Sequence, residues 1–238
     1  MPSHYRDFGI VFAAYRIPPQ RLLANLAWNN PLLGRRRCRV FIVTDALFSE
    51  EVRRQLPPNW FDCVYPKPME IFNLSAAKNF GIQTALDAGC ECVVVTDVDI
   101  AWPRMTLQFC YHVQDHYSVV PIYHMATTFQ DREATELIDY GCGGTVAMTA
   151  ANWRRIRYDE RYVGYGGEDG QLRHDICQAG LAERRNCHVF HIAHDPTKPQ
   201  TNLLGSGRED CWNRDSINPD NWGVNRVLFA KYVEHKPD

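Results

Sequence analysis

The sequence predicts an α/β fold, in which a mainly parallel sheet is flanked by helices. Three observations support this prediction. Apolar segments typical of strands alternate with segments of helical spacing in the first part of the chain. The chain has 238 residues, 45% hydrophobic and 12% aromatic, so it can bury a sizeable core and is not a disordered polymer. One apolar run ends in two aspartates, a pattern typical of the carboxyl end of a parallel strand beside a ligand.

The first part of the chain reads as alternating strands and helices. Leucines repeat at helical spacing in residues 20–28, and Ala77, Gly81 and Ala85 fall four residues apart before Gly89, which is expected to end that helix. Strands are predicted at residues 8–15, 39–44, 61–65 and 91–100, and helices at residues 20–28, 49–56 and 72–88.

The second part of the chain is less regular. Residues 125–140 are ambiguous, Asn152 is a candidate helix cap, and the Pro-, Asn-, Asp- and Gly-rich residues 196–221 are expected to form a loop over the site. Strands are predicted at residues 118–123, 143–149 and 182–192, and helices at residues 170–179 and 222–232.

The net charge and the lengths of the apolar runs limit which kinds of partner the sequence predicts. With 26 basic and 28 acidic residues the net charge is −2, so nothing global attracts a polyanion, and we expect the arginine clusters at residues 35–37, 53–54 and 154–155 to be solvated. No apolar run approaches the roughly 20 residues of a membrane helix, and the first residues lack a signal-peptide pattern. We therefore expect a cytoplasmic protein without a membrane span.

The cysteines predict no disulfide framework. There are nine, an odd number, and no two form a C-x-x-C pair. Most lie within apolar runs, so buried thiols in a reducing compartment are favoured over disulfides or a zinc site.

Asp97 and Asp99 end the predicted strand at residues 91–100. Side chains two residues apart share one face of a strand, so the two carboxylates can point into one cleft. Two like charges held that close need a cation, and a hard divalent ion that carries a diphosphate suits oxygen ligands. The alternative is a strand-end turn with two solvated aspartates.

Two further motifs carry ionisable side chains. Three glycines of residues 162–169 surround an aromatic residue, allow a ligand to approach the backbone, and precede Glu168 and Asp169 at the start of a helix. The alternative is that the two acids only cap the helix. His191 and His194 end a predicted strand and can form a mixed nitrogen and oxygen ligand set with Asp99, although a histidine is often structural.

The order and spacing of short motifs resemble the β-1,4-galactosyltransferase family and its chondroitin-synthase-like relatives. The resemblance covers roughly residues 8–200. The motifs are Phe72-Asn73, Asn79, Gly81, Gln83, Ala85-Leu86, Thr96-Asp97-Val98-Asp99, Gly143-Gly144, Gly164-Tyr165-Gly166-Gly167-Glu168-Asp169 and His194. The resemblance implies a GT-A fold, meaning a Rossmann-like, mostly parallel mixed sheet with flanking helices, a nucleotide-sugar donor, Mn²⁺ or Mg²⁺, and inversion of the anomeric centre.

The resemblance also implies roles for individual residues. Asp99 and His194 would be metal ligands, His191 would lie where the family has its third ligand, and Asp169 would be the general base. Glu168 would hydrogen-bond the acceptor. The implied donor-binding residues are Arg16, Phe72, Asn73, Lys78, Asp97, Gly143 and Gly144, with Asp97 facing the ribose, and the implied acceptor-binding residues are Tyr165, Gly166 and Gly167.

The chain departs from the family pattern in several places. Leu74 replaces the arginine that follows Phe-Asn, while Arg16 is retained and Lys78 could take over a phosphate contact. Tyr165 replaces a tryptophan but keeps a face on which a sugar can stack. The Golgi anchor and stem of animal members are absent, which suggests a bacterial or viral origin.

Together these features predict one catalytic domain over residues 1–238, with a nucleotide-binding half at about 1–100 and an acceptor-binding half at about 101–238. The predicted enzyme is an inverting, metal-dependent glycosyltransferase that moves a hexose or N-acetylhexosamine from a UDP-sugar to a hydroxyl, most simply of a glycan. Gly141 in place of a bulky family residue favours UDP-N-acetylhexosamines, whereas a one-residue shift would place Tyr140 there. The alternatives are a glycosyltransferase acting on modified DNA bases, a nucleotidyltransferase and a non-catalytic sugar-binding module.

Overall fold

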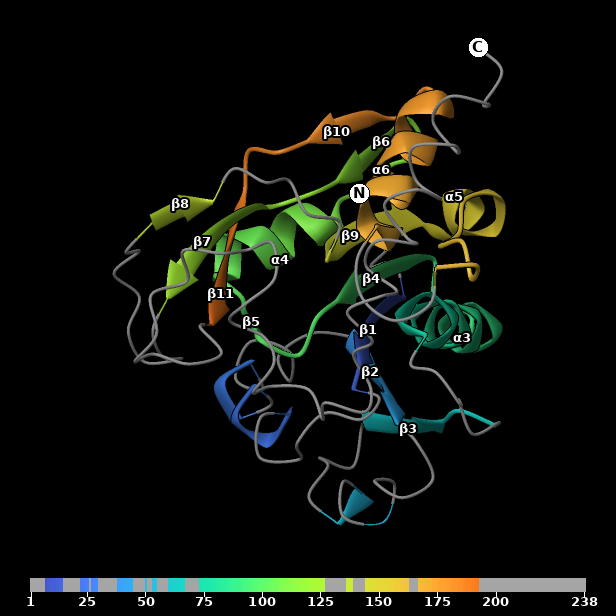
Figure 1. Cartoon of the computed structure of the whole chain (residues 1–238), viewed down its shortest axis with the longest axis vertical. Helices are drawn as coiled ribbons and strands as arrows, with labels where there is room; N and C mark the ends of the chain where they lie inside the picture. The colour runs from blue at the N-terminus through green and yellow to red at the C-terminus, as the bar shows by residue number, and fades with distance from the viewer. Residues whose placement is uncertain are drawn as a thin grey trace, which may run out of the picture.

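A seven-stranded mixed sheet lies at the centre of the computed structural model (Figure 1). The structure describes residues 7–14, 22–25, 27–29, 38–44, 50, 53–54, 60–66, 73–126, 136–138, 144–162 and 167–192. In spatial order the sheet runs β10-β6-β9-β4-β1-β2-β3. Its strands are β1 (Phe8–Ala13), β2 (Cys38–Thr44), β3 (Trp60–Val64), β4 (Cys92–Thr96), β6 (Tyr117–Val119), β9 (Thr145–Thr149) and β10 (Ala182–Arg184).

The pairing of these strands is mostly parallel. β1 lies between β2 and β4 and pairs with both in parallel, β2 pairs in parallel with β3, and β6 with β10. β9 is antiparallel to both β4 and β6. β1, β4 and β9 are buried along their whole length and rich in valine and other apolar residues, as expected for a sheet covered on both faces. The predicted mainly parallel α/β architecture is confirmed.

Helices cover both faces of the large sheet. One apolar cluster joins Val11 and Val95 of the sheet to α3 (Leu74–Asp87), α5 (Ala150–Arg155) and α6 (Glu168–Gln178). The alternate strand residues, such as Ile10 and Val94, belong to a second cluster that includes α4 (Arg104–Tyr111). Because neighbouring strand residues point to opposite faces, α4 covers the face opposite α3 and α6.

α3 packs very close to the large sheet. A Cβ atom added at Gly81 would lie 2.3 Å from Cγ1 of Val11 and 2.7 Å from Cγ2 of Val43. Only a glycine allows this approach, so the position of α3 on β1 and β2 is fixed in the middle of the helix.

A second sheet of four strands, in the order β5-β11-β7-β8, holds the segment after the two aspartates. β11 is antiparallel to β5 and parallel to β7, which places His191 opposite Ile100. Its strands are β5 (Ile100–Ala101), β7 (Ile122–Ala126), β8 (Glu136–Ile138) and β11 (His188–Ile192).

Two predicted strands are wrong in the same way. The strand predicted at residues 118–123 is two strands, β6 and β7, which belong to different sheets. Pro121 lies between them, and a proline has no N–H to continue a ladder. The strand predicted at residues 182–192 is likewise divided into β10 and β11, so each of these two segments passes from one sheet to the other.

The helix boundaries also differ from the predicted ones. The sequence does not predict α4, which begins directly after Pro103. α6 begins at Glu168 rather than at residue 170, and α3 begins at Leu74 with Asn73 as its cap. The cap of α5 is Thr149, whereas Asn152 lies inside that helix and donates to the carbonyl of Asp115, so its predicted role as a cap is wrong.

Several other predictions are tested only in part. Residues 22–25 and 27–29 are helical, whereas residues 196–221 and 222–232 lie outside the described part of the chain. Six of the described cysteines are buried thiols and Cys177 is an exposed one. Within the ranges that the structure describes, no helix is both long and apolar enough to cross a bilayer.

Candidate active site

The two aspartates lie in the turn that follows β4. β4 ends at Thr96, whose hydroxyl lies 3.0 Å from that of Thr145 on β9, and the chain turns before β5 begins at Ile100. Asp97 and Asp99 therefore do not share the face of one strand, and that prediction is wrong. The turn instead directs each carboxylate to a different partner.

Asp97 belongs to a partly buried cluster with Lys78 and Asp169. The ammonium of Lys78 lies 3.3 Å from Oδ1 of Asp97 and 3.2 Å from Oδ1 of Asp169. The Lys78 side chain is fully buried, and its nitrogen lies 5.0 Å from the centre of the Tyr158 ring. One lysine of α3 thus joins the turn after β4 to the start of α6.

α3 also holds the chain segment that leads toward α6. Oδ1 of Asn73 accepts the N–H of Ala76, while its amide donates to the carbonyl of Glu160 at 2.7 Å. The side chain of Asn79 donates to the carbonyl of Tyr158 at 2.8 Å and accepts the N–H of the same residue. The described contacts of Asn73 are thus a helix cap and a hydrogen bond to Glu160, and its predicted contact with the donor stays a prediction.

The first turn of α6 carries the two predicted acids. Gly167 precedes it with φ of 92°, a left-handed conformation that favours glycine, and makes no side-chain cap. Glu168 is buried, whereas the Asp169 side chain is 24% exposed and bonds to Lys78 of another helix. Asp169 is therefore more than a local helix cap, although negative charge also suits this end of a helix.

Asp99 pairs with His191 in the second sheet. Oδ2 of Asp99 lies 3.1 Å from Nε2 of His191, and the carbonyl of Asp99 accepts the N–H of Ile192 at 2.8 Å. The rings of Tyr123 and His191 are inclined at 66° to each other, with a centroid separation of 6.3 Å. A carboxylate oxygen and an imidazole nitrogen so close together fit a divalent ion such as Mn²⁺.

Two of the three predicted metal ligands therefore lie together. His194, the third, lies outside the described residues. Among the residues that are described, no group of three His, Cys, Asp or Glu side chains is placed to hold a metal ion.

Gly144 lies directly against Asp97. A Cβ atom there would be 2.5 Å from Oδ2 of Asp97 and 2.9 Å from the hydroxyl of Tyr123. The glycine thus leaves room for the carboxylate and the phenol at the start of β9. Its predicted contact with the donor is not tested by this geometry.

The electrostatics of the cluster follow from burial and crowding of acids. Burial, together with nearby Asp169 and Asp99, raises the pKa of Asp97 to about 6, against the opposing effect of Lys78. Burial and Asp169 likewise raise the pKa of Glu168 to about 7. Burial opposes the charged form of Lys78, but Asp169 and Asp97 outweigh it and raise the pKa of that ammonium well above its usual value.

Two asparagines that sequence reasoning missed hold the aspartate turn from the other side. The buried amide of Asn25 donates to the carbonyls of Val98 and Ile100, at 2.7 and 3.0 Å. Asn29 donates to Oδ1 of Asn25 and to the carbonyl of Ile100, and accepts the N–H of Trp102 at 3.0 Å. The signal was present in the sequence, because two amides four residues apart in a leucine-spaced helix need buried partners.

The remaining predicted site residues share one outcome. They lie outside the described part of the chain, and their roles stay predictions. They are Arg16, Phe72, Gly143, Tyr165, Gly166 and His194, together with the candidate gate residues Tyr140 and Gly141.

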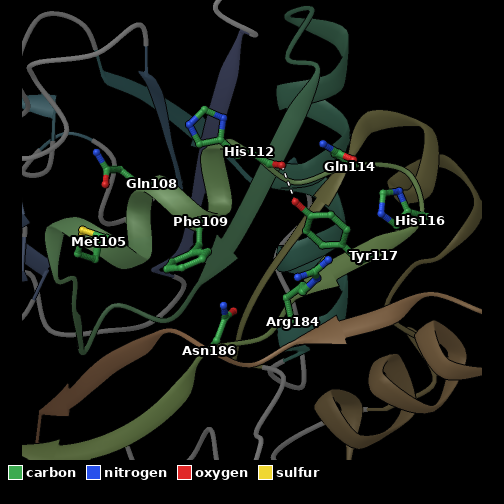
Figure 2. Close-up of a pocket in the computed structure, with 9 residues that line it drawn as sticks. All are labelled: Met105, Gln108, Phe109, His112, Gln114, His116, Tyr117, Arg184 and Asn186. Carbon is green, nitrogen blue, oxygen red and sulfur yellow. Dashed lines mark hydrogen bonds between the residues drawn. The ribbon is translucent and has the colours of Figure 1, made fainter.

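A pocket of about 410 Å³ lies elsewhere, between α4 and the β6–β10 edge of the large sheet (Figure 2). The Arg184 guanidinium stacks 4.7 Å from the centre of the Tyr117 ring, and the Tyr117 hydroxyl donates to the carbonyl of His112. α4 covers the face opposite α3 and α6, so this pocket is separate from the carboxylate cluster.

By sequence, the chain matches no protein-family model and no curated protein sequence. Its structure is similar to solved glycosyltransferases. The catalytic domain of Drosophila β1,4-galactosyltransferase 7, in complex with xylobiose, superposes with a TM-score of 0.54 and 14% identity, covering 92% of this chain and 79% of that one.

Two microbial structures are also similar. The mannosyltransferase PcManGT from Pyrobaculum calidifontis, in complex with GDP-Man and Mn²⁺, gives a TM-score of 0.61 at 14% identity and covers 99% of this chain and 66% of that one. S. aureus TarS 1–349, in complex with UDP-GlcNAc, gives a TM-score of 0.60 at 13% identity and covers 98% of this chain and 68% of that one. Together with the mixed, mostly parallel sheet, these similarities show that the chain has the GT-A fold of nucleotide-diphospho-sugar transferases.

Proposed function

We propose that the chain is an inverting, metal-dependent glycosyltransferase that moves a hexose or N-acetylhexosamine from a UDP-sugar to an acceptor hydroxyl, with a glycan as the favoured acceptor. In this proposal the catalytic unit spans residues 1–238. Residues up to about 100 bind the donor, and the later residues bind the acceptor.

One observation carries the proposal. Four ionisable side chains from three parts of the chain meet beside the carboxyl end of β4, namely Asp97, Asp99, Asp169 and His191, with Lys78 between two of them. Ligands of open α/β sheets bind beside the carboxyl ends of the strands. The solved structures of the same fold support the choice of ligand, since they hold Mn²⁺ with GDP-Man, or UDP-GlcNAc.

Asp99 and His191 are the residues that would hold the metal, with His194 as a third ligand by resemblance. Bound there, a divalent ion supplies positive charge to the departing nucleoside diphosphate. The nearly buried carboxylate and imidazole, 3.1 Å apart, provide one oxygen and one nitrogen for it.

Asp169 is the proposed general base. Its side chain is partly exposed, so an acceptor hydroxyl can reach the carboxylate, and a neighbouring helix holds it in place through Lys78. As the acceptor oxygen attacks the anomeric carbon from the face opposite the leaving diphosphate, Asp169 takes the hydroxyl proton. The configuration inverts in a single displacement, and no covalent enzyme intermediate forms.

The test is a donor screen. The purified chain is incubated with Mn²⁺ and UDP-galactose, UDP-glucose, UDP-N-acetylglucosamine, UDP-N-acetylgalactosamine or GDP-mannose, without acceptor, and release of nucleoside diphosphate is measured. We expect slow hydrolysis of at least one UDP-sugar that stops on addition of EDTA. Hydrolysis that persists in EDTA would contradict the metal dependence, and no binding or hydrolysis of any donor would overturn the proposal.

A further inference from the structure

The lysine between the two carboxylates does not react in the chemistry described above, although it contacts the proposed base. Its sequence position suggested a contact with the donor phosphate, yet its side chain is 0% exposed, and its ammonium is already within ion-pair distance of Asp97 and Asp169. We propose that Lys78 is a positioning residue, whose buried charge holds the aspartate turn and the base at fixed positions relative to each other. As far as it concerns the reaction, this inference rests on the proposed function.

The backbone that carries Lys78 is rigid. Gly81, three residues later and so on the next turn of α3, allows contacts with Val11 and Val43 that no larger residue would permit. The Asn79 side chain exchanges two hydrogen bonds with the backbone of Tyr158. The ammonium is therefore presented from a fixed point on the sheet, which is what a positioning group needs.

The surroundings of Lys78 explain why its charge is retained. A buried ammonium is costly unless it is paired, and here two carboxylates lie within 3.3 Å and the face of an aromatic ring within 5.0 Å. The titratable groups that face it are Asp97 from the turn after β4, Glu168 and Asp169 from α6, and Tyr158 from the segment before α6.

The same cation holds together acids that would otherwise repel. Asp97 and Asp169 both bond to Lys78, and Glu168 is buried one residue from Asp169. Lys78 lowers the pKa of Glu168 against the effect of burial. Without the ammonium, these like charges would move apart or take up protons. Movement would displace the base, and a misplacement of about 1 Å can cost roughly 10² in rate. Proton uptake would leave a carboxyl group that cannot accept the acceptor's proton.

The experiment is a double-mutant cycle of wild type, Lys78→Met, Asp169→Asn and the double variant. Urea unfolding is measured at about pH 5 and about pH 8. We expect Lys78→Met to lose more stability at the higher pH, where the acids are ionised, and to lose less in the Asp169→Asn background. Equal losses at both pH values, with no coupling to Asp169, would overturn the proposal.

If Lys78→Met does not fold, the double variant decides. A folded double variant supports the ion-pair role of Lys78, and an unfolded one rejects it.

Kinetics provide a second readout. We expect Lys78→Met to lose roughly 10² in kcat, with little change in KM for the donor and an acid limb of the pH–rate profile moved to higher pH. An unchanged kcat with a raised KM for the donor would instead identify Lys78 as a phosphate ligand. If wild type transfers no sugar, the proposed function fails, while the unfolding cycle still decides the role of Lys78.

Discussion

Asp97 and Asp99 are two residues apart in one turn, yet they have different environments. Asp97 faces a lysine ammonium that is fully buried and permanently charged. Asp99 faces the imidazole of His191, and these two side chains are the metal ligands of the proposed function. One carboxylate is therefore paired with a cation of the protein, and the other is the one that we propose to bind a metal ion together with its histidine partner.

This difference shows how one short motif can serve two purposes. The turn separates the two carboxylates, so they contact different elements. Asp97 pairs with Lys78 of α3, which also contacts α6, whereas Asp99 pairs with His191 of β11 in the second sheet. The variants below test each side in turn.

The largest expected effect on activity comes from a substitution of Asp99. Asp99→Ala removes one of the two proposed metal ligands that the structure describes, so we expect turnover to fall below detection and Mn²⁺ binding, measured by calorimetry, to weaken sharply. The fold, checked by circular dichroism, should be retained. Asp87→Ala, at the exposed end of α3, is the matched control and should behave as wild type. Full activity of Asp99→Ala would assign the metal to other ligands.

The next largest effect is expected at Asp169, the proposed base, which pairs with Lys78. Asp169→Asn keeps the shape of the side chain but cannot accept the proton, so we expect turnover to fall by roughly 10² or more. Binding of UDP-sugar and Mn²⁺ should stay nearly normal. If the variant instead binds donor poorly but keeps its turnover at saturation, Asp169 contributes to structure rather than to proton transfer.

Glu168→Gln tests the crowding of acids beside Lys78. Burial raises the pKa of Glu168 from an ordinary 4.5 to about 7. A raised pKa means that this group's contribution to stability is fully present below about pH 4.5 and is lost as the pH rises to about 7, by up to about 3 kcal/mol. Glutamine does not titrate, so the variant should gain stability relative to wild type over that range. Urea unfolding at several pH values measures this gain, and parallel profiles for the two proteins would contradict it.

The smallest expected effect comes from a substitution that crowds the Asp97 carboxylate. In Gly144→Ala the new methyl group would lie 2.5 Å from Oδ2 of Asp97, so the carboxylate must shift, at a cost of about 1–3 kcal/mol. In an Asp97→Ala background the same change should cost less, because the oxygen is gone. Chemical denaturation of the four proteins measures the coupling. Equal costs in the two backgrounds would show that Asp97 does not limit the space at Gly144.

The pieces of the site that lie close in sequence could be predicted. The buried run into Asp97 and Asp99 fixed their place at a strand end, and Glu168 and Asp169 follow a glycine-rich segment that indicates a helix start. These signals are local, since strand burial and helix initiation each depend on a few neighbouring residues.

The pairings between distant residues could not be predicted. A lysine in a helix is usually solvated, so nothing near Lys78 in the sequence indicates that it is fully buried against acids 19 and 91 positions away. For the same reason the sequence predicts one strand in each of the segments 118–123 and 182–192. Their division between two sheets depends on which partner strand each half meets, and the residues of the segment itself do not record that.

The central position of β1 has a consequence for synthesis of the chain. β3, β2, β1 and β4 are neighbours in the sheet and come early in the sequence, so they can pair with one another once Thr96 has left the ribosome. β9, which covers the other edge of β4, is made about fifty residues later. At roughly 5–20 residues per second, the valine-rich edge of β4 stays exposed for a few seconds. An exposed edge strand is a template for aggregation, so this interval is when the nascent protein most needs a chaperone.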